Sequence, residues 1–172
     1  AIPTNISSLP FDSSGVYKLR TETKFGSWVD ELWQRCRQQH RLWVIRDQKY
    51  LNWRYVRKPE NKYHIVSVWR DDKPMGYVVF VCADINFGNS VFVMDFLSDL
   101  NFQGAAGLLI RYVIKAAQMY DCAFVSVLLT PGSKYLWLFR RHLFLPLPEK
   151  MFPQPLYFGA RCFDDSIEHL VN

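Results

Sequence analysis

The sequence lacks the paired cysteines and metal-ligand spacings that mark disulfide-rich and zinc-binding proteins. Its four cysteines, Cys36, Cys82, Cys122 and Cys162, are far apart, with no C-x-x-C pair and no nearby histidine at zinc-ligand spacing. We interpret them as reduced thiols, with Cys82 and Cys122 inside strand-like apolar runs. No metal site is predicted, and no serine-histidine-carboxylate triad can be assembled from local motifs.

The sequence also has no long apolar run, internal repeat or low-complexity tract. No run approaches the roughly 18 residues of a membrane span, and no signal peptide precedes the first cysteine. With the reduced thiols, this predicts a cytoplasmic protein without a membrane span. The chain begins at Ala1 without a methionine, which leaves open a tag remnant or a piece of something longer.

What the sequence does contain is an ordinary globular composition with many aromatic residues. The 172 residues are 49% hydrophobic and 22% charged, enough for one domain with a core. Aromatic residues make up 16%, which indicates either a heavily aromatic core or aromatic surfaces that a partner covers. The formal charge of +5 comes largely from residues 18–73. It suits a phosphate-bearing ligand or a polyanion, although a solvated basic face is the plainer reading.

Apolar periodicity predicts two helices, a hairpin and third strand, and then alternating helices and strands. A short strand at 16–20 is also possible after a lead-in. The expected elements are helices at 27–39 (capped by Ser27) and from Asp47 to about 59, strands at 64–69, 75–83 and 91–97, a helix at 107–120, a strand at 122–129, a helix at 134–142, and last strands near Phe144 and at 156–163. The run at 122–129 is nearly all apolar, so it is predicted to be a central strand buried on both faces.

The stretch Val91–Ala117 runs from a strand through a turn of small residues into a helix. Asn101-x-x-Gly104-x-Ala106 places little bulk where the helix begins. The first helical turn leaves its N–H groups without acceptors and carries the positive end of the dipole, so the turn can bind a phosphate. Small residues that let a helix pack closely on a sheet give the same pattern.

These residues carry a resemblance to a known family. The order of elements, and the turn in the position of a Q/R-x-x-G-x-G/A pyrophosphate loop, resemble the GNAT (N-acetyltransferase) superfamily. The segments VDELWQRCR (29–37), RDQKYLNWRYVRKPENKY (46–63) and GYVVF (76–80) are similar to the C-terminal half of bacterial proteins with two GNAT-like domains. The likeness covers roughly residues 27–162.

The resemblance implies an α/β (α+β) fold with a mixed, mostly antiparallel central sheet flanked by helices. It divides the chain into an N-terminal lead-in at 1–26, a GNAT-like domain at 27–163 and a tail at 164–172.

The resemblance also implies acyl transfer from acetyl-CoA or another acyl-CoA to an amine or similar nucleophile on a small molecule. The pantetheine arm would lie along Phe96 and Leu97, where a backbone N–H meets the thioester carbonyl. The implied pyrophosphate loop opens with Asn101 and binds through the N–H groups of Phe102, Gln103, Gly104, Ala105 and Ala106. Positioning plus an oxyanion-type donor supplies much of the acceleration in such a site.

Several positions depart from the family pattern. Asn101 stands where Gln or Arg is usual, and Phe139 replaces the tyrosine that protonates the leaving thiolate. Tyr135, one turn earlier, is the candidate substitute, or else it anchors its helix onto the sheet. Asp95 is the candidate base because desolvation inside a strand raises a carboxyl pKa; the alternative is a carboxylate satisfied by backbone or arginine hydrogen bonds.

Three functions therefore stay open. The first is an acyltransferase that relies mainly on backbone positioning. The second is a non-catalytic GNAT-like half-domain that pairs with another such domain or with a second copy and helps to shape a substrate cleft. The third and least favoured is a nucleic-acid binder that uses the aromatic and basic residues Trp53, Arg54, Tyr55, Arg57 and Lys58, an alternation that equally places aromatics inward and charges outward.

Overall fold

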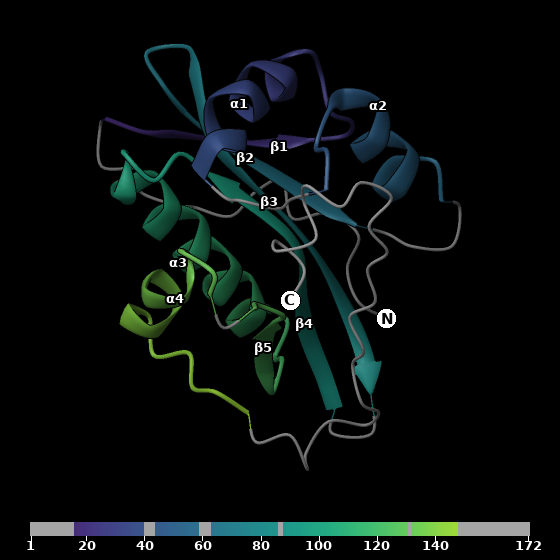
Figure 1. The fold of residues 1–172 in the computed structure, drawn as a ribbon. Helices are drawn as coiled ribbons and strands as arrows, with labels where there is room; N and C mark the ends of the chain where they lie inside the picture. Colours follow the sequence, from purple (N-terminus) through teal and green to yellow (C-terminus); the bar gives the residue numbers. More distant parts are fainter. Residues whose placement is uncertain (1–15, 40–43, 59–62, 86–87, 131, 148–172) are drawn as a thin grey trace, which may run out of the picture.

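The computed structural model describes residues 16–39, 44–58, 63–85, 88–130 and 132–147, and its described strands form one sheet in the order β1-β2-β3-β4-β5 (Figure 1). Neighbouring strands are antiparallel except β4 and β5, which are parallel. The strands are β1 Lys18–Glu22, β2 His64–Arg70, β3 Lys73–Ile85, β4 Gly88–Ser98 and β5 Phe124–Val127. The predicted mixed, mostly antiparallel sheet flanked by helices is confirmed.

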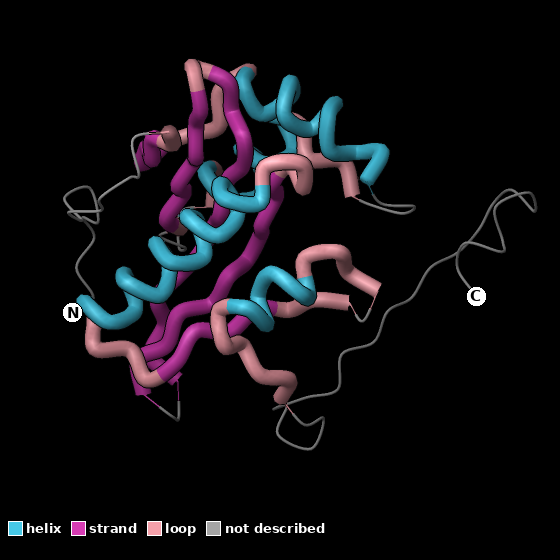
Figure 2. Tube along the Cα trace, turned by 90° about the vertical axis from the view of Figure 1, so that its left-hand side faces the viewer, coloured by secondary structure: helices cyan, strands magenta, loops and turns pink. Residues whose placement is uncertain are grey.

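Helices cover both faces of the sheet. They are α1 Trp28–Cys36, the short 3₁₀ turn η1 Arg37–Gln39, α2 Gln48–Leu51, the π-helical turn η2 Asn52–Val56, α3 Gln103–Met119 and α4 Leu136–Arg141. The longest, α3, runs across one face of the strands with α4 beside it (Figure 2). On the opposite face, α1, α2 and η2 pack together.

Two separate apolar cores follow from the alternation of side chains along the strands. On β3, Val78 and Phe80 belong to the core under α3 and α4, whereas Tyr77 and Val79 belong to the core under α1 and α2. Successive residues of a strand point to opposite faces, so a central strand buried on both sides reads as a continuous apolar run. The second core is rich in aromatic rings, including Phe25 packed edge-on against Tyr77 at 5.2 Å.

Local signals in the sequence set several boundaries. Asp47 is the N-cap of α2, and its carboxylate accepts the Tyr50 N–H at 2.7 Å. The β2–β3 hairpin turns at Asp71 and Asp72, both with positive φ, as short hairpin turns require. Ser27 precedes α1 as predicted, but its side chain makes no capping hydrogen bond.

Three predictions about the second half of the chain were wrong. The helix α3 begins at Gln103 rather than at residue 107, because the small residues of the predicted turn are themselves helical. β5 contains four residues, none of them buried, and lies at one end of the described strand order, so it is not a central strand buried on both faces. Phe144 lies in a loop, and the strand predicted at 156–163 lies outside the described residues.

The aromatic segment Tyr50–Tyr55 packs against residues of α1 and of the sheet. Leu51 and Tyr55 are buried, and the Asn52 amide pairs with the main chain of Phe25, accepting its N–H at 2.9 Å and donating to its C=O at 2.8 Å. Trp53, between them, is 56% exposed. The Asn52 pair fixes η2 to the residues before α1 and thereby positions Tyr55 against the sheet.

Asn52→Ala is expected to lower the free energy of unfolding by about 2 kcal/mol, because it leaves the half-buried Phe25 N–H without its acceptor and leaves the Phe25 C=O with Gln48 Nε2, at 3.1 Å, as its donor. Urea unfolding followed by circular dichroism measures the loss. Trp53→Ala is the matched control on the same turn, and a smaller effect is expected from it since its ring is mostly exposed. Equal losses in the two variants would contradict the role given to Asn52.

Candidate functional site

The candidate site lies where β4 continues past the end of β5. The parallel pairing of β4 with β5 ends at Val93 and Val127, whereas β4 continues to Ser98, paired on its other side with β3. A register shift places an extra residue, Met94, at the start of this extension, and such bulges often occur beside functional sites. On the β3 side the strands approach closely: a Cβ on Gly76 would lie 2.8 Å from the Leu97 carbonyl oxygen. Residues 94–98 therefore present a strand edge without a strand partner among the described residues.

Side chains bind the polar groups along this edge. The Phe96 N–H donates to Asp95 Oδ1 at 2.9 Å. The Tyr135 hydroxyl donates to the Ser98 C=O at 2.8 Å and accepts the Ser98 N–H at 3.1 Å. The Met94 C=O accepts the Tyr55 hydroxyl at 3.3 Å. The edge is thus capped by polar side chains from three different parts of the chain.

Asp95 lies at the centre of a buried polar cluster on the α1/α2 face. Its Oδ1 accepts Arg46 Nε at 2.9 Å, and its Oδ2 accepts the Tyr77 hydroxyl at 3.3 Å. The side chains of Asp95 and Arg46 are 6% and 19% exposed. Burial and then the Asp95 charge raise the pKa of Tyr77, and the same two causes raise the pKa of Tyr55 to about 12. Both tyrosines are therefore neutral donors at physiological pH.

Tyr135 approaches the same edge from the opposite face. It is 2% exposed, and its ring packs edge-on against Phe96 at 5.2 Å. Burial raises the pKa of its hydroxyl, against the lowering effect of the Ser98 hydrogen bond. Asp95 and Tyr135, the two predicted catalytic residues, are thus brought to one short stretch of β4, and each is held by main-chain hydrogen bonds in the structure.

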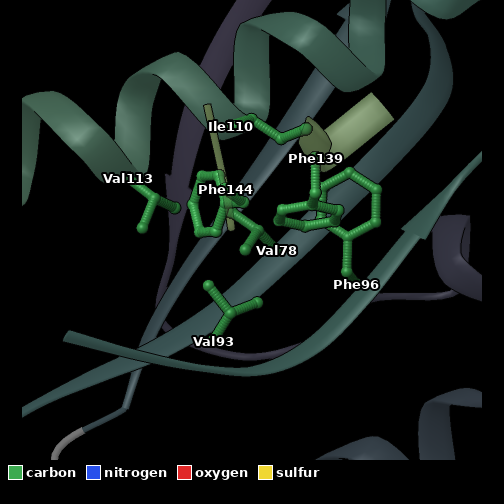
Figure 3. Close-up of a pocket in the computed structure, with 7 residues that line it drawn as sticks. All are labelled: Val78, Val93, Phe96, Ile110, Val113, Phe139 and Phe144. Atoms are coloured by element: carbon green, nitrogen blue, oxygen red, sulfur yellow. The ribbon is translucent and has the colours of Figure 1, made fainter. Parts of the chain in front are cut away.

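Apolar side chains fill the space between β4, α3 and α4. Phe96, Phe139 and Phe144 point toward one another there (Figure 3). No space large enough for a water molecule remains between the lining residues. The residues around this space are Val78, Val93, Phe96, Ile110, Val113, Phe139 and Phe144. Phe139, which stands where the family pattern has tyrosine, contributes packing: it is 2% exposed and contacts the Phe96 and Phe144 rings edge-on.

The predicted pyrophosphate loop forms the start of α3, and its N–H groups differ in their surroundings. The Asn101 N–H donates to the Asp99 carboxylate, the Phe102 N–H to the Asp99 C=O, and the Ala105 N–H to the Phe102 C=O. Gln103 and Gly104, the first two helical residues, are exposed, whereas Ala105 and Ala106 are buried. Of the six predicted positions, Asn101, Gln103 and Gly104 are exposed, and the last two lie in the first turn of α3, where N–H groups lack helical acceptors.

Charged and aromatic neighbours of this helix start were not identified from the sequence. The Arg70 guanidinium lies 5.8 Å from the Phe102 ring centre, and Asp99, 4% exposed, is 3.6 Å from Arg35. A Cβ on Gly104 would lie 3.1 Å from the Tyr17 ring. Arg70 belongs to the run of basic residues at 18–73, and the β2–β3 hairpin brings it beside the loop.

The residues proposed for a nucleic-acid surface differ in how much of each side chain is exposed to solvent. Tyr55 is buried and contacts Tyr63 edge-on at 5.1 Å, whereas Trp53 is exposed beside Tyr50. Arg54 donates to the Tyr55 hydroxyl at 3.2 Å. One aromatic residue of this alternation, Tyr55, is thus buried and donates a hydrogen bond to the edge of β4.

The described residues contain neither a membrane-spanning helix nor a metal-binding cluster. In the part of the chain that the structure describes, each helix is too short or too polar to cross a membrane. Searched over the same residues, groups of three or more His, Cys, Asp or Glu placed to hold a metal ion are absent.

Several solved structures with a similar architecture are acetyltransferases. A probable acetyltransferase superposes with a TM-score of 0.62 at 12% identity, over 84% of this chain and 99% of that one. The aminoglycoside acetyltransferase meta-AAC0020 from an uncultured soil metagenomic sample gives 0.58 at 13%, over 87% and 98%. AAC(6')-Iy, solved with a CoA bisubstrate analog, gives 0.55 at 15%, over 85% and 99%.

At these identities the likeness is one of fold, and the fold is that of the GNAT N-acetyltransferases, as the sequence resemblance implied. No family model and no curated protein matches the sequence.

Arg46→Met is expected to destabilise the protein by about 2–3 kcal/mol, because it leaves the buried Asp95 carboxylate without its cation. The double variant Arg46→Met/Asp95→Asn removes the charge as well and is expected to recover at least half of that loss. Chemical unfolding of both variants beside the unmodified protein measures it. A double variant no more stable than the single one would contradict the assignment of Asp95 as a charged partner of Arg46.

Proposed function

We propose that this protein is an acyl-CoA-dependent N-acyltransferase that acylates an amine or similar nucleophile on a small molecule. The observation that supports this best is the edge of β4 at residues 94–98, which pairs with no second strand among the described residues and ends five residues before the exposed start of α3. A ligand with an amide-bearing arm and a diphosphate can use both: main-chain groups along the strand and N–H groups at the helix N-terminus. The shared fold with acetyltransferases, one of them solved with a CoA analog, supports the same reading.

For the acyl donor, the proposed contacts are those named in the sequence analysis. The diphosphate lies at the loop that opens with Asn101, against the N–H groups of residues 102–106, where Gln103 and Gly104 are exposed. Arg70, beside Phe102, adds a positive charge at the same place. The arm lies along Phe96 and Leu97, and the Phe96 N–H is the proposed donor to the thioester oxygen.

For the chemistry, Asp95 and Tyr135 are the proposed acid–base groups. The C–N bond forms as the C–S bond breaks, Asp95 accepts the proton that the acceptor nitrogen loses, and the thiolate takes a proton from Tyr135. We further propose that the protein acts in the cytoplasm.

The proposal is tested by isothermal titration of the protein with acetyl-CoA and with CoA, for which saturable binding is expected. Gly104→Glu is expected to weaken binding at least tenfold, since it adds a negative charge at the proposed phosphate site. The fold is expected to survive, because the close neighbour of the new Cβ is the side chain of Tyr17.

Gly104→Gln is the matched control for this variant. It adds nearly the same bulk without the charge, so it separates repulsion of phosphate from steric blocking. Equal affinities in the Glu and Gln variants would contradict a phosphate at Gly104. No binding of CoA to the unmodified protein would contradict the function itself.

A second candidate function is favoured by the packing against β4. Because Phe96, Phe139 and Phe144 leave no space between β4 and α4, the domain also fits a non-catalytic GNAT-like module that pairs with a second such domain or copy to shape a cleft. This candidate predicts a folded protein that binds neither CoA nor acetyl-CoA, so the same titration distinguishes the two.

A further inference from the structure

The Tyr135 hydroxyl takes the place of a neighbouring strand at the end of β4. It bonds both main-chain groups of Ser98, donating to the C=O at 2.8 Å and accepting the N–H at 3.1 Å. On the β3 side the next residue is used instead, since the Asp99 N–H donates to the Met75 C=O at 2.9 Å. Ser98 therefore directs both groups toward the unpaired edge, where Tyr135 meets them.

The hydrogen bonds between Tyr135 and Ser98 are shielded from water by the surrounding side chains. Tyr135 is 2% exposed and Ser98 is fully buried, so water does not compete for the two hydrogen bonds. The Tyr135 ring is held edge-on by Phe96. A buried main-chain N–H or C=O without a partner is strongly disfavoured, so any ligand that uses the Ser98 edge has to replace what Tyr135 provides.

We propose that Tyr135 is a latch on the acyl-donor site: its hydroxyl occupies the Ser98 main-chain groups in the free protein and is displaced when the amide-bearing arm of an acyl-CoA takes its place. The inference rests on the proposed function and adds a closed state to it. An amide group offers one donor and one acceptor, the same pair that the hydroxyl offers to Ser98.

The latch has a thermodynamic consequence. When only a fraction of the protein is in the binding-competent state, the apparent affinity for the ligand is lowered in proportion to that fraction. Breaking the Tyr135 hydrogen bonds is part of opening the site, so their removal shifts the population toward the open state. The filled space beside Phe96 is then the closed form of the site, and a rotation of the Tyr135 side chain is the first step of opening.

Tyr135→Phe tests the latch because it removes only the hydroxyl and keeps the ring in the core. CoA is expected to bind about tenfold more tightly to this variant, a change of about 1.4 kcal/mol. Tyr112→Phe is the matched control: Tyr112 is buried in the same core, on α3, and its hydroxyl lies beside Thr21 instead. No change in CoA affinity is expected for it.

Each outcome of the titrations decides the matter. Tighter binding to Tyr135→Phe than to the unmodified protein supports the latch. Binding to the unmodified protein with no gain in Tyr135→Phe overturns the latch and leaves the proposed function intact. No binding to either protein overturns both.

Thermal unfolding supplies a second measurement that does not depend on activity. Without ligand, Tyr135→Phe is expected to melt at a lower temperature than the unmodified protein, because Ser98 loses both partners. At saturating CoA the difference is expected to shrink, because the ligand satisfies the same groups. A difference that stays constant with and without CoA would show that the hydroxyl has a purely structural role.

Discussion

The separation of β4 from β5 is the constraint on which the site depends. β3 holds β4 along its whole length, down to Ser98, while β5 pairs with it only as far as Val93. A strand edge buried within a protein cannot remain without hydrogen-bond partners. The side chains of Asp95, Tyr55 and Tyr135 are therefore required at this edge, and each reaches it from a different element.

Side chains from both faces of the sheet meet at this edge of β4. Asp95 belongs to the α1/α2 face through Arg46 and Tyr77, whereas Tyr135 belongs to the α3/α4 face. Burial is the main cause of the raised pKa of Tyr135, and the Asp95 charge is a further one. A donor that enters along β4 and an acceptor that enters over the opposite face would meet between them, which is what two-substrate chemistry requires.

Some residues of the site could be predicted from the sequence, and others could not. The small residues at 104–106 indicated that a helix begins nearby, although they belong to α3 itself rather than to a turn before it, and the isolated Asp95 inside an apolar strand marked an unusual carboxylate. The closeness of Tyr135 to Ser98, 37 residues apart in the chain, has no sequence signal because it depends on how α4 packs beside β4. Arg46 gave no signal either, since one arginine in a basic run does not identify its carboxylate partner.

The sequence by itself determined the order of the elements as far as α4, the hairpin and the resemblance to the acetyltransferases, because these follow from local periodicity, turn residues and short motifs. Only the tertiary structure decided that β5 is a short strand with no buried residue, that α3 begins four residues earlier than predicted, and that aromatic rings fill the space beside β4. The reason is physical: periodicity reports which residues are buried, whereas pairing and packing between distant segments decide which main-chain groups stay open to a ligand.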